Sequence, residues 1–200
     1  RLLAKSHSRL SFYYMINGEY DQSLEQAGEA GRLFESLKDE RGLADTKYTI
    51  ASVYYKRDNL HAGLQYITEC LGIYRKFNDY ANEARCYKVL GTIYEYFGDI
   101  DNAIEANEAA IAAAEKIGDI NIKTNACNPL SGLYLNKNNI DKAMEIIEEC
   151  IALKQQTGDT RGLAFAYYGR GKIYTKKVQF DLAEADFSKS IAIHIEMGEK

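Results

Sequence analysis

A period of 40 residues runs through the whole sequence and constrains its fold more than any other feature. Tyrosine stands at the same place in every period, at Tyr14, Tyr54, Tyr94, Tyr134 and Tyr174. Small residues recur three positions before each tyrosine and nine positions after it; in the third period they are Gly91 and Ala103. Five aligned copies without an insertion or deletion indicate a chain assembled from repeated structural units.

Apolar residues within each period predict two amphipathic helices. In the third period, residues 84–97 carry apolar side chains three and four positions apart, the spacing of one helix face. Gly98-Asp99 interrupts this pattern, and Gly118-Asp119 ends the second helical stretch. An aspartate is placed to cap the second helix in every unit except the one with His61. These aspartates are Asp21, Asp101, Asp141 and Asp181. We therefore expect an all-α fold of five helix-turn-helix units, with ten antiparallel-paired helices.

The periods divide the chain into units that we expect to form one array. The units are residues 1–40, 41–80, 81–120, 121–160 and 161–200. Because the sequence begins with Arg1, we also expect it to be a piece of a longer protein. Ile191 and Ile195 give the last predicted helix an apolar edge, whereas repeat arrays need polar end caps for solubility. Either further repeats follow, or this edge supports self-association into a homo-oligomer.

Composition excludes several classes of function. The formal net charge of −4 argues against nucleic acid as the main partner, because phosphate binding needs a concentrated basic face. No apolar run approaches the roughly 18 uncharged residues of a membrane-spanning helix, and no signal peptide is recognisable. The four cysteines form no C-x-x-C pair and the three histidines lie far apart, which is poor material for zinc. We expect free core cysteines in a reducing, cytoplasmic compartment, and no metal or cofactor.

The repeated residues resemble a known family. Leu90-Gly91-x-x-Tyr94, with Ala103 twelve residues after the glycine, is similar to the tetratricopeptide pattern, and Ala183-x-x-x-Phe187 matches a further part of it. The usual tryptophan and closing proline are absent, and the unit is longer than the ordinary repeat of about 34 residues. This longer form resembles the repeats of a polarity scaffold that links G-protein α subunits to the spindle, and those of bacterial signalling regulators. The resemblance implies an α-solenoid, a right-handed superhelix whose first helices line a concave groove.

Candidate binding residues are those that lie between the core positions of the first helices, facing this implied groove. They are Lys5, Arg9, Tyr48, Ser52, Arg85, Lys88, Thr92, Asn125, Asn128, Tyr168 and Lys172. Arg85 and Lys88 are one helical turn apart and can point at the same acidic group. Asn125 and Asn128, also one turn apart, can donate to and accept from a peptide backbone. We expect a protein or peptide partner with an acidic group near the third unit; the alternative is that these are solvated surface residues.

Two residues break the pattern. Pro129 predicts a kink or a late helix start near residues 125–128, unless it is a tolerated first-turn proline. Arg170 replaces the leucine or isoleucine of the other units, and we expect it to reach outward or to pair with a carboxylate of the preceding unit. The surrounding Gly169-Arg170-Gly171-Lys172 lacks the spacing of a phosphate-binding loop.

The function predicted first is a protein-interaction module within a signalling or scaffold protein. The alternative is a peptide- or ligand-sensing regulatory segment of a bacterial cyclase, histidine kinase or transcription regulator. An enzyme is not expected, because the sequence contains no G-x-S-x-G, no H-E-x-x-H and no phosphate loop.

Overall fold

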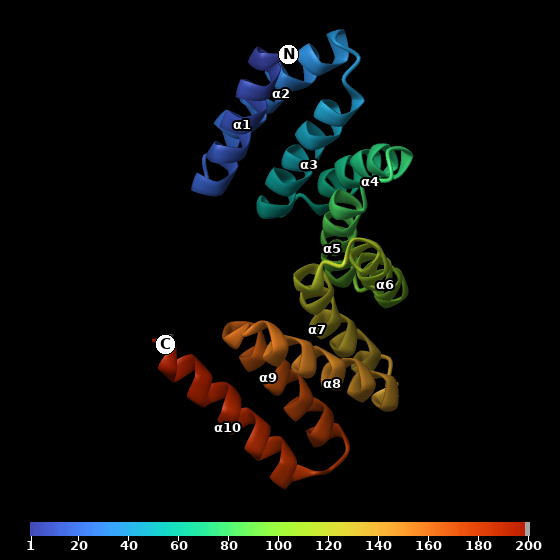
Figure 1. The fold of residues 1–200 in the computed structure, drawn as a ribbon, viewed down its shortest axis with the longest axis vertical. Helices are drawn as coiled ribbons and strands as arrows, with labels where there is room; N and C mark the ends of the chain where they lie inside the picture. The colour runs from blue at the N-terminus through green and yellow to red at the C-terminus, as the bar shows by residue number, and fades with distance from the viewer. Residues whose placement is uncertain (199–200) are drawn as a thin grey trace. The chain divides into compact units, whose positions relative to one another are not determined.

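The computed structural model describes residues 1–198, and this part of the chain contains ten α-helices and no strand (Figure 1). The helices are α1 (Leu2–Asn17), α2 (Tyr20–Ser36), α3 (Glu40–Lys56), α4 (Leu60–Lys76), α5 (Tyr80–Tyr96), α6 (Ile100–Ile117), α7 (Ile120–Asn136), α8 (Ile140–Thr157), α9 (Thr160–Lys176) and α10 (Phe180–Glu196). The predicted all-α helical repeat fold is confirmed. No helix in this described part is long and apolar enough to cross a membrane.

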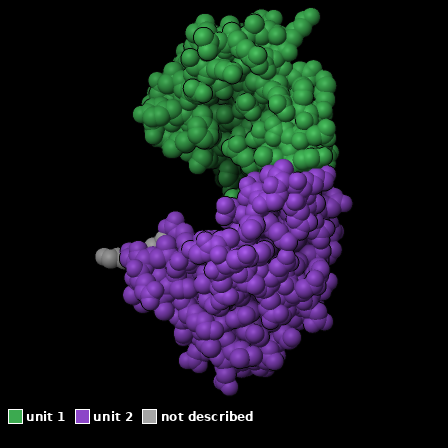
Figure 2. Space-filling model, in the orientation of Figure 1, with its two compact units in different colours: residues 1–98 green, residues 99–200 purple. Residues whose placement is uncertain are grey.

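The helices form two compact units, which are drawn in different colours in Figure 2. Unit 1 is Arg1–Gly98 and holds α1–α5; unit 2 is Asp99–Lys200 and holds α6–α10. In unit 1, consecutive helices pack on one another, and α3 also contacts both α1 and α5. The odd-numbered helices of unit 1 therefore form one layer, which we call the inner layer. In unit 2, α7 and α9 contact each other in the same way.

Small residues lie where paired helices cross. The Ser11 hydroxyl donates to the carbonyl oxygen of Ser23 at 2.8 Å, and the Ser23 hydroxyl donates to that of Ser11 at the same distance. In unit 2, the Ser131 hydroxyl donates to the carbonyl of Ala143 at 2.8 Å. These residues are buried, and their short side chains let two backbones approach while their hydroxyls remain hydrogen-bonded.

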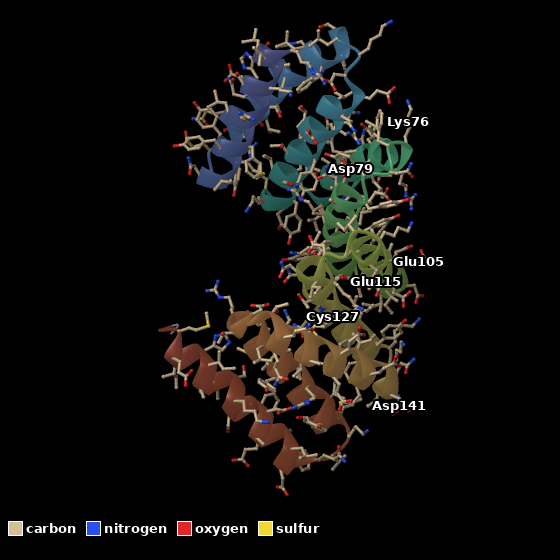
Figure 3. All side chains as sticks on the ribbon, viewed as in Figure 1. Lys76, Asp79, Glu105, Glu115, Cys127 and Asp141 are labelled. Atoms are coloured by element: carbon tan, nitrogen blue, oxygen red, sulfur yellow. The ribbon has the colours of Figure 1, made fainter. Side chains whose placement is uncertain are left out.

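The caps of the second helices differ from the prediction. Asn139 is the cap of α8, and its side-chain oxygen accepts from the backbone N–H of Lys142 at 3.2 Å. Asp141, labelled in Figure 3, lies in the first turn of α8 instead. In the same way Asp99, not Asp101, caps α6. Asp21 and Asp181 also lie in first turns rather than at caps. The physical reason is that the helices begin two residues earlier than expected, so these aspartates face the helix dipole from inside the first turn.

The turns between consecutive repeats of 40 residues lie where the sequence pattern predicts the second helix of a repeat to end. Gly118 has a left-handed backbone with φ of 66°, and Asp119 then caps α7 by accepting from the N–H of Ile122 at 3.0 Å. Asn78 is also left-handed, with φ of 52°, and is followed by the α5 cap Asp79 (Figure 3).

Pro129 does not delay the start of its helix. α7 is helical from Ile120 to Asn136, and Pro129 lies in its interior, so the expectations of a late start and of a first-turn proline are both wrong. The capping of α7 by Asp119 and the burial of Leu130 and Leu133 maintain the helix, although the proline ring offers no N–H to the helix ladder.

Arg170 pairs within its own repeat rather than with the preceding unit. Its Nε and Nη2 donate to the two carboxylate oxygens of Asp186 at 2.6 and 3.0 Å. Asp186 comes from α10, and it stands where the third and fourth periods carry Ala106 and Ile146. Arg170 and Asp186 both replace apolar residues of other periods, and each therefore compensates the charge of the other.

Candidate functional site

Two adjoining hollows lie on unit 1 over the inner layer. The first has a volume of about 380 Å³ and is lined by Ser8, Arg9, Phe12, Asp45, Tyr48, Thr49, Tyr74, Asn82 and Arg85. The second has a volume of about 340 Å³ and is lined by Arg1, Lys5, Ser8, Arg9, Phe34, Asp39, Arg41, Gly42 and Asp45. They share Ser8, Arg9 and Asp45, so they form one continuous depression, which we call the unit 1 trench.

Three cations in the trench have no carboxylate partner within the described residues. Lys5 and Arg9 are exposed on α1, and no salt bridge within residues 1–198 involves either. The Arg85 guanidinium lies over the ring of Tyr48, with its central carbon 4.7 Å from the ring centroid. Arg85 also donates to the Asn82 side-chain oxygen at 3.2 Å. The positive charge of these side chains therefore remains available to a ligand.

Asp45 brings a negative charge into the same trench. Its Oδ1 accepts a hydrogen bond from the Tyr74 hydroxyl at 2.7 Å. Desolvation raises the pKa of Asp45 above its ordinary value, although the hydrogen bond from Tyr74 acts in the opposite direction. Burial also raises the pKa of Tyr48 and that of Tyr74, where the hydrogen bond to Asp45 adds to the effect. Both tyrosines are thus neutral hydrogen-bonding groups at any ordinary pH.

The other predicted residues of the first three periods lie beside the trench. Ser52 is half-buried on α3, and its hydroxyl donates to the Tyr48 carbonyl at 2.9 Å. Lys88 is exposed on α5, and Thr92 donates its hydroxyl to the Lys88 carbonyl at 3.1 Å. Of Arg85 and Lys88, only Arg85 lines the two hollows described above.

The predicted residues of unit 2 are arranged differently from one another. Asn125 is exposed on α7, whereas Asn128 is half-buried against α9. The Asn128 Oδ1 lies 3.1 Å from the position that a Cβ at Gly169 would take, so its amide packs on the α9 backbone. On α9, the Lys172 ammonium lies 5.3 Å from the centroid of the Tyr168 ring.

Sequence reasoning did not place Tyr74 or Asn82 in the site. Tyr74 lies on α4, the second helix of its repeat, whereas the predicted groove residues all lie on first helices. One signal was present: the same place in the period holds Phe34, Ala114 and Lys154 in other units, which is an unusual variety of chemistry for a buried position.

The four cysteines are free and buried, as predicted for core positions. They lie in facing pairs. Cys70 Sγ is 3.5 Å from Cys86 Sγ, and Cys127 (Figure 3) and Cys150 both direct their thiols at the Thr124 carbonyl, at 3.2 and 3.6 Å. Hydrogen bonding with Cys70 and burial raise the pKa of Cys86, which disfavours its thiolate. Residues 1–198 contain no group of three or more side chains suited to hold a metal ion.

The sequence matches two family models, both described as tetratricopeptide repeat, over residues 42–116 and residues 124–157. A curated relative, the transcriptional activator NprA of Geobacillus stearothermophilus, is 30% identical over 114 residues. That match covers 56% of this chain and 28% of NprA, so the chain aligns with little more than a quarter of this relative.

Solved structures with low sequence identity share the fold. BtubC from P. vanneervenii has a TM-score of 0.87 at 18% identity, covering 100% of this chain and 82% of that one. Aspartyl phosphate phosphatase F from Bacillus subtilis has a TM-score of 0.81 at 18% identity, covering 99% of this chain and 53% of that one. A Rap protein solved in complex with Competence and Sporulation Factor has a TM-score of 0.75 at 16% identity, covering 98% and 55%.

Proposed function

The chain belongs to the tetratricopeptide repeat family, and from this membership we propose that it is a protein-interaction module. Its unit 1 trench binds an extended segment of a partner protein that carries an acidic group. The observation that supports this most directly is the set of cations without a salt bridge, Lys5, Arg9 and Arg85, that line the trench. Arg85 among them lies over the ring of Tyr48. Arginine and tyrosine are the side chains that contribute most often to binding energy at protein interfaces.

The remaining predicted residues extend this proposal to neighbouring surfaces. Ser52, Lys88 and Thr92 contact the parts of the segment that leave the trench. On unit 2, Asn125, Tyr168 and Lys172 contact a partner, while Asn128 acts by positioning α7 against α9. Families of this kind host many unrelated roles, so the biological process does not follow from the fold.

The proposal is tested by reversing charge at Arg85 in the trench and at Lys88, one helical turn away on α5. We expect Arg85→Glu combined with Lys88→Glu to weaken binding of a capped, fluorescein-labelled peptide rich in glutamate at least tenfold, about 1.4 kcal/mol. Fluorescence anisotropy measures this. Lys176→Glu combined with Lys177→Glu is the matched control, since these exposed residues change the net charge equally away from the trench. Equal loss of binding in both double variants would refute a specific site.

A regulatory role within a larger protein is the second candidate function. It is favoured by the 30% identity with NprA, which is a transcriptional activator, and by the fold shared with a Rap protein solved with its factor. In that case, a peptide that occupies the trench alters the output of the flanking domains in the intact parent protein. An output that does not respond to a saturating peptide would exclude this role. We propose no catalytic role for the array itself.

A further inference from the structure

We infer that the trench is selective for a segment in which a basic side chain accompanies the acidic one, and that Asp45 determines this selectivity. The inference rests on the proposed function and concerns the same site. It starts from an alternation of charge: at one place in the period, the three inner-layer helices of unit 1 carry Lys5, Asp45 and Arg85. All three line the trench, so its charges run positive, negative, positive across α1, α3 and α5.

Asp45 accepts the hydrogen bond of the buried Tyr74 hydroxyl, a task that needs an acceptor but not a negative charge. It lies inside α3, six residues after the Asp39 cap, and therefore caps nothing. No salt bridge within the described residues reaches it. Only Oδ1 has a hydrogen-bond partner there, the Tyr74 hydroxyl; Oδ2 forms no hydrogen bond within residues 1–198, and the charge of Arg85 acts on the carboxylate without forming an ion pair. A carboxylate that is partly desolvated and unpaired is costly, and a ligand cation would relieve that cost.

The spacing of the inner layer indicates the spacing of charges in the ligand. Packed helices lie roughly 8–10 Å apart, so neighbouring charges of the trench recur at about this interval. An extended chain in the polyproline II conformation rises about 3.1 Å per residue and repeats its face every three residues. Side chains at positions i and i+3 of such a ligand are therefore about 9 Å apart on one face. The fitting segment carries an acidic residue for Arg85 or Arg9 and a basic residue three positions away for Asp45.

The test uses four capped, fluorescein-labelled peptides that differ in the charges they carry or in the spacing of those charges. Their central residues are Glu-Pro-Pro-Lys, Glu-Pro-Pro-Gln, Gln-Pro-Pro-Lys, and a peptide with the same glutamate and lysine seven positions apart. We expect wild-type protein to bind Glu-Pro-Pro-Lys about fivefold more tightly than Glu-Pro-Pro-Gln or the widely spaced peptide, as for one additional charge pair. Asp45→Asn should reduce this ratio to about one while it retains binding of Glu-Pro-Pro-Gln.

Asparagine is nearly isosteric with aspartate and still accepts from Tyr74, so the variant should fold; thermal unfolding followed by circular dichroism verifies this. Glu25→Gln, on the exposed face of α2, is the matched control and should keep the wild-type ratio. The inference is wrong if wild-type protein binds Glu-Pro-Pro-Lys and Glu-Pro-Pro-Gln equally well, or if the preference for Glu-Pro-Pro-Lys survives in Asp45→Asn. The proposed function still stands in either case, provided that Arg85→Glu with Lys88→Glu weakens peptide binding at least tenfold. If no peptide binds, both are wrong.

Discussion

Glycines at two junctions between helices leave space for a bulky side chain that lies eight positions earlier in the sequence. A Cβ at Gly42 would collide with the Phe34 ring, and a Cβ at Gly162 would collide with the buried Lys154 and with the carboxylate of Asp159. Lys154 donates to that carboxylate at 2.9 Å and is itself buried. Each glycine therefore makes room for a side chain that fills the junction between two helical pairs.

Replacing Gly42 should destabilise the protein even though alanine favours helix. We expect Gly42→Ala to lower the free energy of unfolding by about 1–3 kcal/mol, because the added methyl overpacks the contact with Phe34. Gly28→Ala is the control: nothing lies within 4 Å of its Cβ position in α2, so it should raise stability by about 0.5–1 kcal/mol. Urea unfolding measures both. A stabilised Gly42→Ala variant would show that the Phe34 ring moves aside at little cost.

The Arg170–Asp186 pair should make stability depend on acid. Burial alone would raise the pKa of Asp186, but hydrogen bonds from Arg170 and Lys189 outweigh it and lower the folded-state pKa below the ordinary 3.8. The stabilisation is therefore complete above pH about 4 and is lost as the pH falls through the lower folded-state value. We expect Asp186→Asn to lower the free energy of unfolding by about 1.5–3 kcal/mol at pH 7, since the half-buried Arg170 loses its charged hydrogen-bond partner. The difference from wild type should shrink as the pH falls below 4.

The double variant Arg170→Leu with Asp186→Ala separates pairing from packing. It restores residue types that the other periods carry at these positions, and replacement of a whole buried pair is often neutral. Unfolding near wild-type stability at pH 7, without the acid dependence, would support the compensation described above. A loss as large as that of Asp186→Asn alone would contradict it.

At the scale of elements, the helix boundaries show which features the sequence periodicity can predict and which it cannot. The period of 40, with its recurring tyrosine, was enough to predict helical pairs and the turns at Gly98 and Gly118. It was not enough to choose between Asp99 and Asp101 as a cap, because both are good capping residues and only the backbone shows which lies outside the helix. Pro129 was misjudged for a similar reason: neighbouring helices hold α7 together where local propensity favours a break.

The corrected caps predict that Asn139 contributes more to stability than Asp141, which lies two positions later. We expect Asn139→Ala to lower stability by about 1 kcal/mol, because it removes the cap of α8. Asp141→Ala should cost only about 0.3–1 kcal/mol, the usual value of a first-turn carboxylate at the helix dipole. Thermal unfolding distinguishes them, and the reverse order would restore the cap that periodicity alone predicted.

The sequence was enough to predict which helices carry the residues of the candidate site, but not which contacts those residues make. Placement between core positions predicted Arg9, Tyr48 and Arg85 as groove-facing residues, and the structure has all three in the lining of one hollow. The contribution of Tyr74 depends on a contact between different helices, and so does the position of Asn128 against Gly169. Such contacts depend on how helices cross, which a one-dimensional pattern does not record.

At the scale of the whole molecule, α10 presents the apolar edge that the sequence predicted. Ile191 and Ile195 are 59% and 69% exposed, whereas Leu71 and Ile151, which occupy the place of Ile191 in other periods, are 6% exposed. We expect the 200-residue chain to self-associate through this edge. Ile191→Glu with Ile195→Lys should shift it toward monomer in sedimentation velocity at high concentration. A wild-type chain that is strictly monomeric there would exclude the prediction.

The glycine junctions have a consequence for how such an array can evolve. Phe34 fits over Gly42, whereas the equivalent positions of the third and fourth periods hold Ala114 and Ile122. Each junction between helical pairs has its own combination of large and small residues. A repeat moved to another place would therefore set two bulky residues against each other or leave a void between them. We therefore expect exchange of one repeat for another to destabilise the array, whereas changes to the exposed side chains of the inner layer leave these junctions intact.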